Sequence, residues 1–179
     1  ITMKRFSIIT MGLLVVAFTF FGCATQPSGP GWVTLIDGDK GLENWNRIGD
    51  ANWRAGSGGI MADKGKGGML VSKNSYKDFE IRAEFWAETN TNSGIFIRCS
   101  DPRKISSVNC YEVNIWDIRP NPTYATGAIV DLASVPVPIV YKAGGKWNTY
   151  VIYAKGSEIT VSLNGVVTVH TQDSKHASG

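Results

Sequence analysis

The stretch D-F-E-I-R-A-E-F-W-A-E, residues 78–88, alternates apolar with mostly ionisable side chains. Apolar side chains such as Phe85 fall on one side of the alternation, and ionisable ones such as Glu84 fall on the other. Because successive side chains of a strand point to opposite faces, this pattern predicts a β-strand with one apolar and one charged face. The segments N-S-G-I-F-I-R-C (92–99) and C-Y-E-V-N-I-W-D (110–117) predict two further strands. The charged face is either solvated surface or the floor of a polar cleft.

The rest of the chain after residue 31 is also β in pattern, with turn residues between short apolar runs. Asn164-Gly165 separates two alternating runs and predicts a two-residue hairpin, because both residues tolerate positive φ. No helical period follows the N-terminal segment, so we predict an all-β, concanavalin-like sandwich or jelly roll of two antiparallel sheets. The expected strands are residues 32–36, 52–56, 59–63, 68–71, 78–88, 93–99, 110–117, 127–131, 147–155, 158–164 and 166–171.

The N-terminus has the pattern of an export signal. Basic residues precede an apolar run over 8–21, which is shorter than the roughly 20 residues of a membrane span. Cys23 follows a glycine, as in the bacterial lipobox, where the cysteine is lipidated; an ordinary secretory signal is the alternative. We therefore expect a signal peptide over 1–23, a tether over 24–31 and one β-sandwich domain over 32–179. The expected location is the bacterial cell envelope (periplasm or outer membrane), with membrane contact only through a lipid on Cys23.

Charge and histidine content exclude several functions. The chain has 18 Lys and Arg against 15 Asp and Glu, and two of the cations fall in the signal segment. No basic cluster remains, so we expect no nucleic-acid partner. His170 and His176 are the only histidines and lack Cys or carboxylate partners at ligand spacing, so we expect surface positions and no metal site. We expect no cofactor, although the sequence leaves the use of a divalent cation open.

Cys99 and Cys110 flank the loop 100–109, and export would permit a disulfide between them. A bond across the mouth of a hairpin is geometrically reasonable. Strict alternation opposes it, because Cys99 follows the apolar set of Ile97 while Cys110 shares the polar set of Glu112. A one-residue irregularity at the strand end would reconcile the two patterns. The residues alone leave the bond open.

Carboxylates on neighbouring strands are the best indication of chemistry. Cleavage of a glycosidic bond needs acid and base groups, and paired carboxylates are the simplest solution. Alternation places Glu112, Asn114 and Trp116 on one face, and it groups Arg98 with Phe96 on the preceding strand. Aromatic rings beside carboxylates and amides suit sugars, which offer C–H faces and hydroxyls. In strands this apolar, an ionised group is expected to be paired or functional.

Other charged and aromatic residues are expected to be structural. Glu80 and Glu88 lie on a charged strand face and are expected to be solvated. Four tryptophans outside the three central strands are expected to pack in the core or at sheet edges; they are Trp32, Trp45, Trp53 and Trp147.

Seven segments in order along the chain resemble one known family. They are G-W-V-T-L-I-D-G-D-K-G-L-E-N-W (31–45), Y-K-D-F-E-I-R-A-E-F (76–85), N-S-G-I-F-I-R (92–98), Y-E-V-N-I-W-D (111–117), T-G-A-I (126–129), K-A-G-G-K-W-N-T-Y (142–150) and L-N-G (163–165). Together they are similar to the 3-keto-disaccharide hydrolase domain family, whose fold is a concanavalin-like β-sandwich. The resemblance covers nearly all of residues 31–165.

The resemblance implies an exported bacterial enzyme of the glycosyl hydrolase or lyase type that acts on 3-keto-glycosides, with a small oligosaccharide or glycoside as its partner. A ketone at C3 makes the C2 proton acidic, so that a base can remove it and expel the anomeric substituent before hydration. The implied catalytic residues are Glu112 or Asp117 as base, with Arg98 and Lys142 as electrostatic partners. The implied substrate contacts are Asn92, Asn114, Trp116, Thr126 and Glu84. Alternation places Asp117 opposite Glu112 unless the strand bends.

The chain departs from the family pattern at a few positions. Cys99 and Cys110 stand where the family has small or polar residues, and this double change favours a disulfide. Asn114 and Val130 replace a usual Gln and a usual aromatic residue. Family members continue past the Asn-Gly hairpin, so we expect a truncated sandwich without its C-terminal closing strand. A non-catalytic carbohydrate-binding module of the cell envelope and an inactive fragment are the alternatives to an enzyme.

Overall fold

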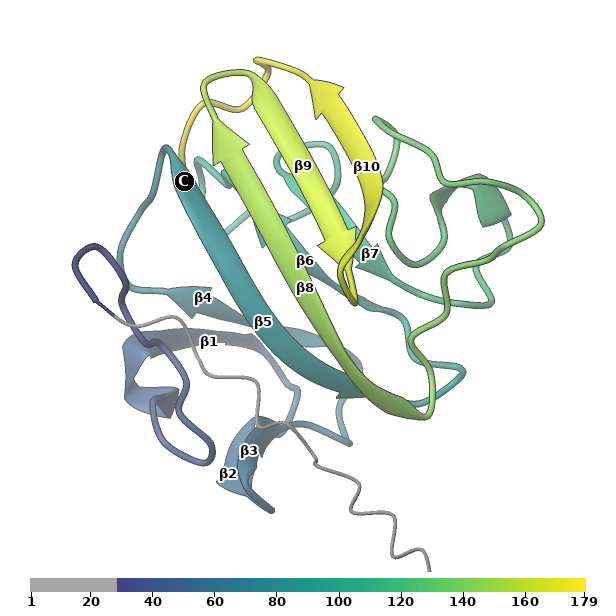
Figure 1. Ribbon diagram of the computed structural model, residues 1–179. Coiled ribbons are helices and arrows are strands. Elements are labelled where there is room, and N and C mark those ends of the chain that lie inside the picture. Colours follow the sequence, from purple (N-terminus) through teal and green to yellow (C-terminus); the bar gives the residue numbers. More distant parts are fainter. Residues whose placement is uncertain (1–28) are drawn as a thin grey trace, which may run out of the picture. The chain divides into compact units, whose positions relative to one another are not determined.

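A computed structural model describes residues 29–179, and within them the chain is almost entirely β (Figure 1). The predicted signal peptide and the lipidated Cys23 lie outside the described residues. None of the helices in residues 29–179 has the length and apolar character needed to cross a membrane. The elements are η1 (Leu42–Asn44), β1 (Trp45–Gly49), β2 (Arg54–Gly56), β3 (Gly59–Met61), β4 (Gly68–Ser72), β5 (Phe79–Ala87), β6 (Ser93–Ile97), β7 (Tyr111–Ile115), η2 (Pro122–Tyr124), β8 (Lys146–Lys155), β9 (Glu158–Leu163) and β10 (Val166–Gln172).

The largest sheet has four antiparallel strands in the order β10-β9-β8-β5. Its longest pairing joins β5 to β8 without interruption, from Phe79 opposite Ala154 to Ala87 opposite Lys146. The predicted alternation places the apolar side chains of β5 on the inner face, where Phe85 stacks on Tyr150 at 5.0 Å between ring centroids. This sheet is the first layer of the sandwich that the sequence predicted.

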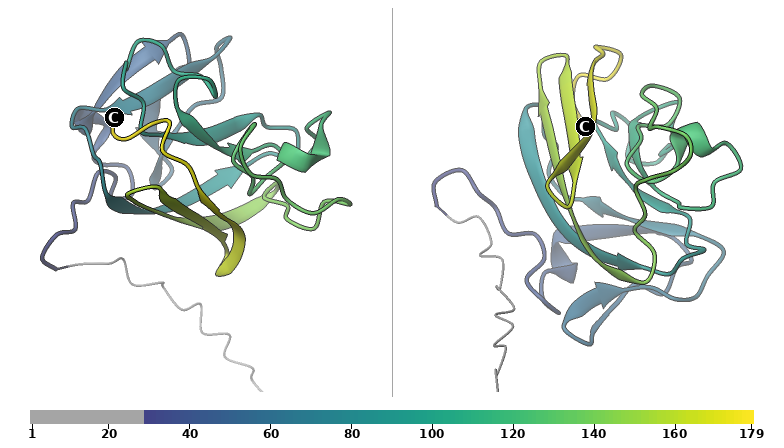
Figure 2. Two further views of the ribbon diagram at one scale, coloured as in Figure 1. Left: turned by 90° about the horizontal axis from the view of Figure 1, so that it is seen from above. Right: turned by 45° about the vertical axis from the view of Figure 1, so that its right-hand side comes forward.

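The second layer is built on the antiparallel pair of β6 and β7 (Figure 2). The segment 126–130 runs along the free side of β7, since Asn114 N–H donates to Ala128 O and Val130 N–H donates to Glu112 O, both at 3.0 Å. The inner face of β7 carries Val113, which is fully buried against the four-stranded sheet. The opposite, outer face of β7 therefore carries the polar residues of the strand.

Strand predictions succeeded where alternation was strong and failed where it was weak. The Asn164-Gly165 hairpin is confirmed, with both residues at positive φ (52° and 83°) between β9 and β10. The strand expected over 32–36 is wrong; the carbonyl of Leu35 accepts a hydrogen bond from the Asn44 side chain at 2.9 Å instead of joining a ladder. The segment 127–131 forms only isolated bridges, and β1, with its W-N-R-I-G sequence, was not foreseen.

Cys99 and Cys110 form a disulfide, with 4.6 Å between their Cα atoms. The irregularity that would permit it is Arg98, which has a left-handed backbone with φ of 55° directly after β6. This turn moves Arg98 and Cys99 out of the alternation that the sequence predicts for the strand. Cys99 can then meet Cys110 at the start of β7.

Candidate functional site

The outer face of β7 brings together Glu112, Asn114 and Trp116, as alternation predicted. Two residues of β6 lie opposite them, since Phe96 pairs with Glu112 and Gly94 pairs with Asn114. A Cβ on Gly94 would lie 2.8 Å from the carbonyl oxygen of Val113 and 3.5 Å from Cγ of Glu112. Only glycine fits at this position without a shift, so the approach to the Glu112 side chain stays open.

Glu112 is half-buried, and no hydrogen bond or ion pair to its carboxylate is found within residues 29–179. Burial raises the pKa of the Glu112 carboxyl, because desolvation disfavours the charged form. The positive charge of Arg119 partly lowers that pKa, and the negative charge of Asp131 raises it further. A carboxyl with a raised pKa and no fixed partner is suited to exchange a proton with a bound ligand.

Arg119 supplies the positive charge at this face, and sequence reasoning missed it. Its guanidinium carbon lies 5.3 Å from the centroid of the Trp116 ring, in the range of a cation–π contact. No alternation places Arg119, because it lies beyond the end of β7. The sequence feature that could have indicated Arg119 is its position three residues after Trp116, in the loop through which the chain turns back toward β7.

Asp131 is the second residue that sequence reasoning missed. It is exposed and has a left-handed backbone with φ of 58°, which a residue other than glycine adopts at a cost. The tight turn is closed by hydrogen bonds between Ile129 and Ala133, both at 2.9 Å. The turn directly follows Val130, whose N–H binds the backbone of Glu112, and this explains why the charge of Asp131 raises the pKa of Glu112.

Asn114 and Thr126, both expected to contact substrate, are fully buried. Asn114 Nδ2 donates to Tyr124 O at 2.6 Å, and its Oδ1 is buried without a hydrogen-bond partner in the described part of the chain. Thr126 Oγ1 accepts from Trp116 N–H at 2.9 Å and donates to Asp117 at 2.6 Å. Both side chains therefore hold the loop beyond β7 against the strand, and neither is open to solvent.

Asp117 does not share the face of Glu112. Its carboxylate accepts hydrogen bonds from Thr126 Oγ1, from Ala143 N–H at 3.0 Å and from Gly144 N–H at 2.8 Å. These bonds fasten the far end of the segment 118–142 to the end of β7. The bend that would bring Asp117 to Glu112 is therefore not found.

The expectation that Arg98 lies beside Phe96 and Glu112 was wrong. The left-handed turn sends its side chain inward, where it is 2% exposed. It donates to the carbonyl oxygens of Lys77 (3.1 Å), Gly156 (2.7 Å) and His176 (3.4 Å), and its guanidinium lies 3.5 Å from the carboxylate of Asp78. Arg98 is therefore buried and paired, as expected for an ionised group in an apolar strand, but its partners are other parts of the fold.

The other predicted contacts are exposed and more scattered. Glu84 lies on the outer face of the four-stranded sheet, 3.9 Å from Arg82, and so belongs to the other layer. Asn92 directly precedes Ser93, which pairs with the end of β7. Lys142 directly precedes Ala143, whose N–H donates to Asp117. Asn92 and Lys142 thus lie toward the Trp116 end of the site.

The family model that matches this chain covers residues 31–179 and describes a 3-keto-alpha-glucoside-1,2-lyase-like domain. The chain belongs to this family. The resemblance seen in the sequence is thereby confirmed. No curated protein sequence matches the chain.

Two candidate glycosyl hydrolases and a carbohydrate binding module are among the solved structures that resemble this chain. One candidate glycosyl hydrolase from Parabacteroides distasonis ATCC 8503 is 29% identical with a TM-score of 0.51, over 56% of this chain and 54% of that protein. The chain thus spans about half the length of that protein. A second from the same organism is 18% identical (TM-score 0.63, 77% and 71% covered). The carbohydrate binding module CBM66 from Bacillus subtilis is 17% identical (TM-score 0.56, 76% and 83% covered). The last two support the fold alone.

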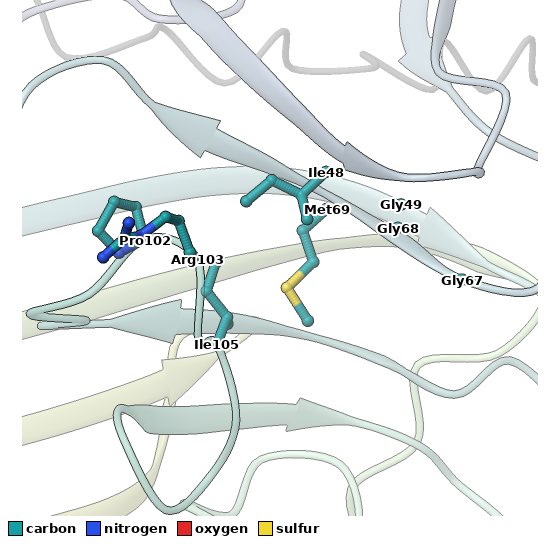
Figure 3. A pocket seen from close by; sticks show the side chains of 8 residues that line it. All are labelled: Ile48, Gly49, Gly67, Gly68, Met69, Pro102, Arg103 and Ile105. Atoms are coloured by element: carbon teal, nitrogen blue, oxygen red, sulfur yellow. The ribbon is translucent and has the colours of Figure 1, made fainter.

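Two of the cavities in residues 29–179 bear on ligand binding. One of about 230 Å³ lies between the β1–β4 sheet and the loop after Cys99, and Ile48, Met69, Pro102 and Ile105 make its wall largely apolar (Figure 3). The other, of about 140 Å³, has a mixed lining in which Val130 and Leu132 stand beside Asp131 and His176. Within residues 29–179, no three His, Cys, Asp or Glu side chains gather into a metal-binding cluster.

His176 was expected to be a surface residue, but it is partly buried. Its ring meets Tyr111 edge-on at 4.9 Å between centroids, and burial lowers the pKa of its imidazole. The Tyr111 hydroxyl donates to Asp173 and accepts from the backbone N–H of His176 at 3.0 Å. His170, in contrast, is exposed and lies 3.0 Å from Thr160 Oγ1.

Proposed function

We propose that this protein cleaves 3-keto-glycosides by elimination, with Glu112 as the general base. The observation that carries the proposal is the half-buried Glu112 carboxyl, whose pKa is raised by burial and which no described protein group binds. A general base works best when its pKa lies close to the working pH, and ordinary glutamates lie below it. Asp117 is the weaker candidate, because three protein donors already occupy its carboxylate.

The elimination proceeds in two steps. The Glu112 carboxylate takes the proton from C2, and the electron pair of that C–H bond forms an enolate with the C3 ketone. The enolate then expels the anomeric substituent: a C1=C2 double bond forms, the C1–O bond breaks, and the departing oxygen takes up a proton. Addition of water across the double bond completes an overall hydrolysis.

Arg119 and Trp116 have separate roles in this mechanism. The guanidinium of Arg119 carries the fixed positive charge at the face, and it would stabilise negative charge on the C3 oxygen as the enolate forms. The Trp116 ring offers an apolar surface to the C–H face of the sugar. We therefore assign to Arg119 the electrostatic role that the family resemblance implied for Arg98, while Lys142 remains available at the exposed rim.

The family and its relatives support the coarse assignment to carbohydrate chemistry. The matching family is named for lyase chemistry on 3-keto-glucosides, and one structural relative is a candidate glycosyl hydrolase. The disulfide between Cys99 and Cys110 favours an oxidising compartment. It agrees with the predictions of export and of a lipid anchor at Cys23, which stay predictions.

The test is to incubate the purified protein with a 3-keto-glucoside bearing a chromogenic leaving group, and with its unoxidised parent. We expect release from the keto compound only, and a loss of about 10²- to 10⁴-fold in the Glu112→Gln variant. Glu84→Gln is the matched control, since it changes an exposed glutamate on the other layer and should keep full activity. Full activity of Glu112→Gln would overturn the role of Glu112.

A carbohydrate-binding module without catalysis is the second candidate. The observation that favours it is a pair of exposed tryptophans on the four-stranded sheet. Binding of unoxidised glycans without turnover of any keto compound would replace the enzyme proposal with this one.

A further inference from the structure

Two tryptophans stand exposed and side by side on the outer face of the four-stranded sheet. Trp86 of β5 and Trp147 of β8 are directly opposite in the strand register, and they are 50% and 67% exposed. Side chains that oppose each other in antiparallel strands have Cβ atoms roughly 5 Å apart, so the two indoles are neighbours. Trp147 was expected in the core or at a sheet edge, and its exposure rules out the core.

This face is turned away from the Glu112 site. Figure 1 looks onto it, with β5 and β8 in front of β6 and β7. The inward side chains of the same strands, such as Tyr150 and Ile152, are fully buried against β7. The Trp86–Trp147 pair and Glu112 thus lie on opposite outer faces of the two layers, and a ligand on one does not touch the other.

The polar surroundings of the pair indicate the chemistry of its partner. Glu84 and Thr149 oppose each other two residues before the tryptophans along β5, and Arg82 follows on the same face. Arg82 lies 3.9 Å from Glu84, so their charges largely cancel, and its Nε is buried without a hydrogen-bond partner in the described residues. Glu80 adds a negative charge further along. Arg82, Glu84 and Glu80 together carry a net negative charge, which disfavours anionic polymers and anionic membranes.

We propose that Trp86 and Trp147 bind a neutral glycan chain, apart from the site of Glu112. Large exposed aromatic side chains in a cluster mark interaction surfaces. The C–H faces of sugar rings would lie on the two indoles, and their hydroxyls would bond to Glu84, Thr149 and Arg82 at the edge. The inference does not rest on the proposed catalysis, because an unoxidised polymer can occupy this surface.

The experiment measures retention of the full-length protein by immobilised neutral polysaccharides, such as β-glucan, xylan and fructan. We expect the wild type to bind at least one, and the Trp86→Ala/Trp147→Ala double variant to lose at least about tenfold in affinity. A Trp86→Phe/Trp147→Phe variant keeps two rings and should retain part of the binding. Val167→Ala is the matched control, because Val167 is 56% exposed on the same sheet.

Three outcomes would overturn the proposal. They are failure of the wild type to bind any neutral glycan, unchanged binding in the alanine double variant, and loss of binding in Val167→Ala as well. If the wild type sediments as a dimer and the alanine double variant does not, the partner of the tryptophan pair is a second copy of the chain and not a glycan. If anionic vesicles retain the wild type and not the double variant, the partner is a membrane and not a glycan. Turnover of a small 3-keto-glucoside should be unchanged in that variant, which separates this test from the test of Glu112.

Discussion

Glu112 illustrates how one residue can be tuned by two neighbours of opposite sign. Burial raises the pKa of its carboxyl, Arg119 counteracts that rise and Asp131 adds to it. Both neighbours belong to the segment after β7 and neither makes a hydrogen bond to Glu112, so their influence acts through space. The pH at which Glu112 becomes a competent base is thus set first by burial and then adjusted by these two loop residues.

The two neighbours should shift the pH dependence of catalysis in opposite directions. A base must be ionised, so kcat/KM rises as the pH increases through the pKa of Glu112. In Asp131→Asn a negative charge that raises this pKa is lost, and the acidic limb should move to lower pH. In Arg119→Met a positive charge that lowers it is lost, and the limb should move to higher pH while the rate at the plateau also falls.

The measurement is the profile of kcat/KM against pH on a 3-keto-glucoside. Asp101→Asn is the control, because Asp101 pairs with Arg103 in the loop before β7, whereas the charges that shift the pKa of Glu112 are those of Arg119 and Asp131. It should leave the limb in place. Limbs that shift in the same direction in Asp131→Asn and Arg119→Met would contradict the assignment of the limb to Glu112.

Elements with strong alternation could be predicted from the sequence, and elements set by tertiary contacts could not. The pairing of β9 with β10 follows from Asn164-Gly165, and the polar face of β7 follows from its pattern. The inward turn of Arg98 depends on one backbone angle at the end of β6, which no periodicity encodes. Asp131 reaches Glu112 because the segment 126–130 returns along β7, and Arg119 lies in the segment that leads from the end of β7 into this return. The sequence therefore predicted the strand residues Glu112 and Trp116 of the site, and it did not predict the loop residues Arg119 and Asp131.

Asp117 is expected to hold that returning segment, and Asp117→Ala should loosen it. The change leaves Thr126 and the N–H groups of Ala143 and Gly144 without their acceptor. Hydrogen bonds to charged groups contribute about 1.5–3 kcal/mol each, and part is regained from water, so we expect the free energy of unfolding to fall by about 2–4 kcal/mol. Urea unfolding followed by tryptophan fluorescence measures it.

Asp63→Ala is the matched control for Asp117. Asp63 also accepts several hydrogen bonds, from Arg54 and Asn52, but they lie on the exposed surface. Its removal should change the unfolding free energy much less, because water replaces the lost bonds. Equal losses in the two variants would show that the Asp117 contacts are no stronger than a surface ion pair.

At the scale of the whole domain, Arg98 joins parts that are remote in sequence. Its guanidinium binds the backbone just before β5, the turn between β8 and β9, and the segment after β10. The neighbouring disulfide closes the loop between β6 and β7. A single left-handed residue therefore serves the disulfide and the closure of one end of the sandwich at once.

Arg98→Met should be among the most destabilising single changes in the domain. The methionine fills part of the space, but three carbonyl oxygens lose their donor, and we expect the unfolding free energy to fall by about 3–5 kcal/mol. Arg98→Lys should recover only part, since an ammonium cannot span the three oxygens as the guanidinium does. Urea unfolding of both variants measures this order, with Arg103→Met, whose side chain is 86% exposed, as the control. Unchanged stability in Arg98→Met would mean that the buried charge costs as much in desolvation as its hydrogen bonds contribute.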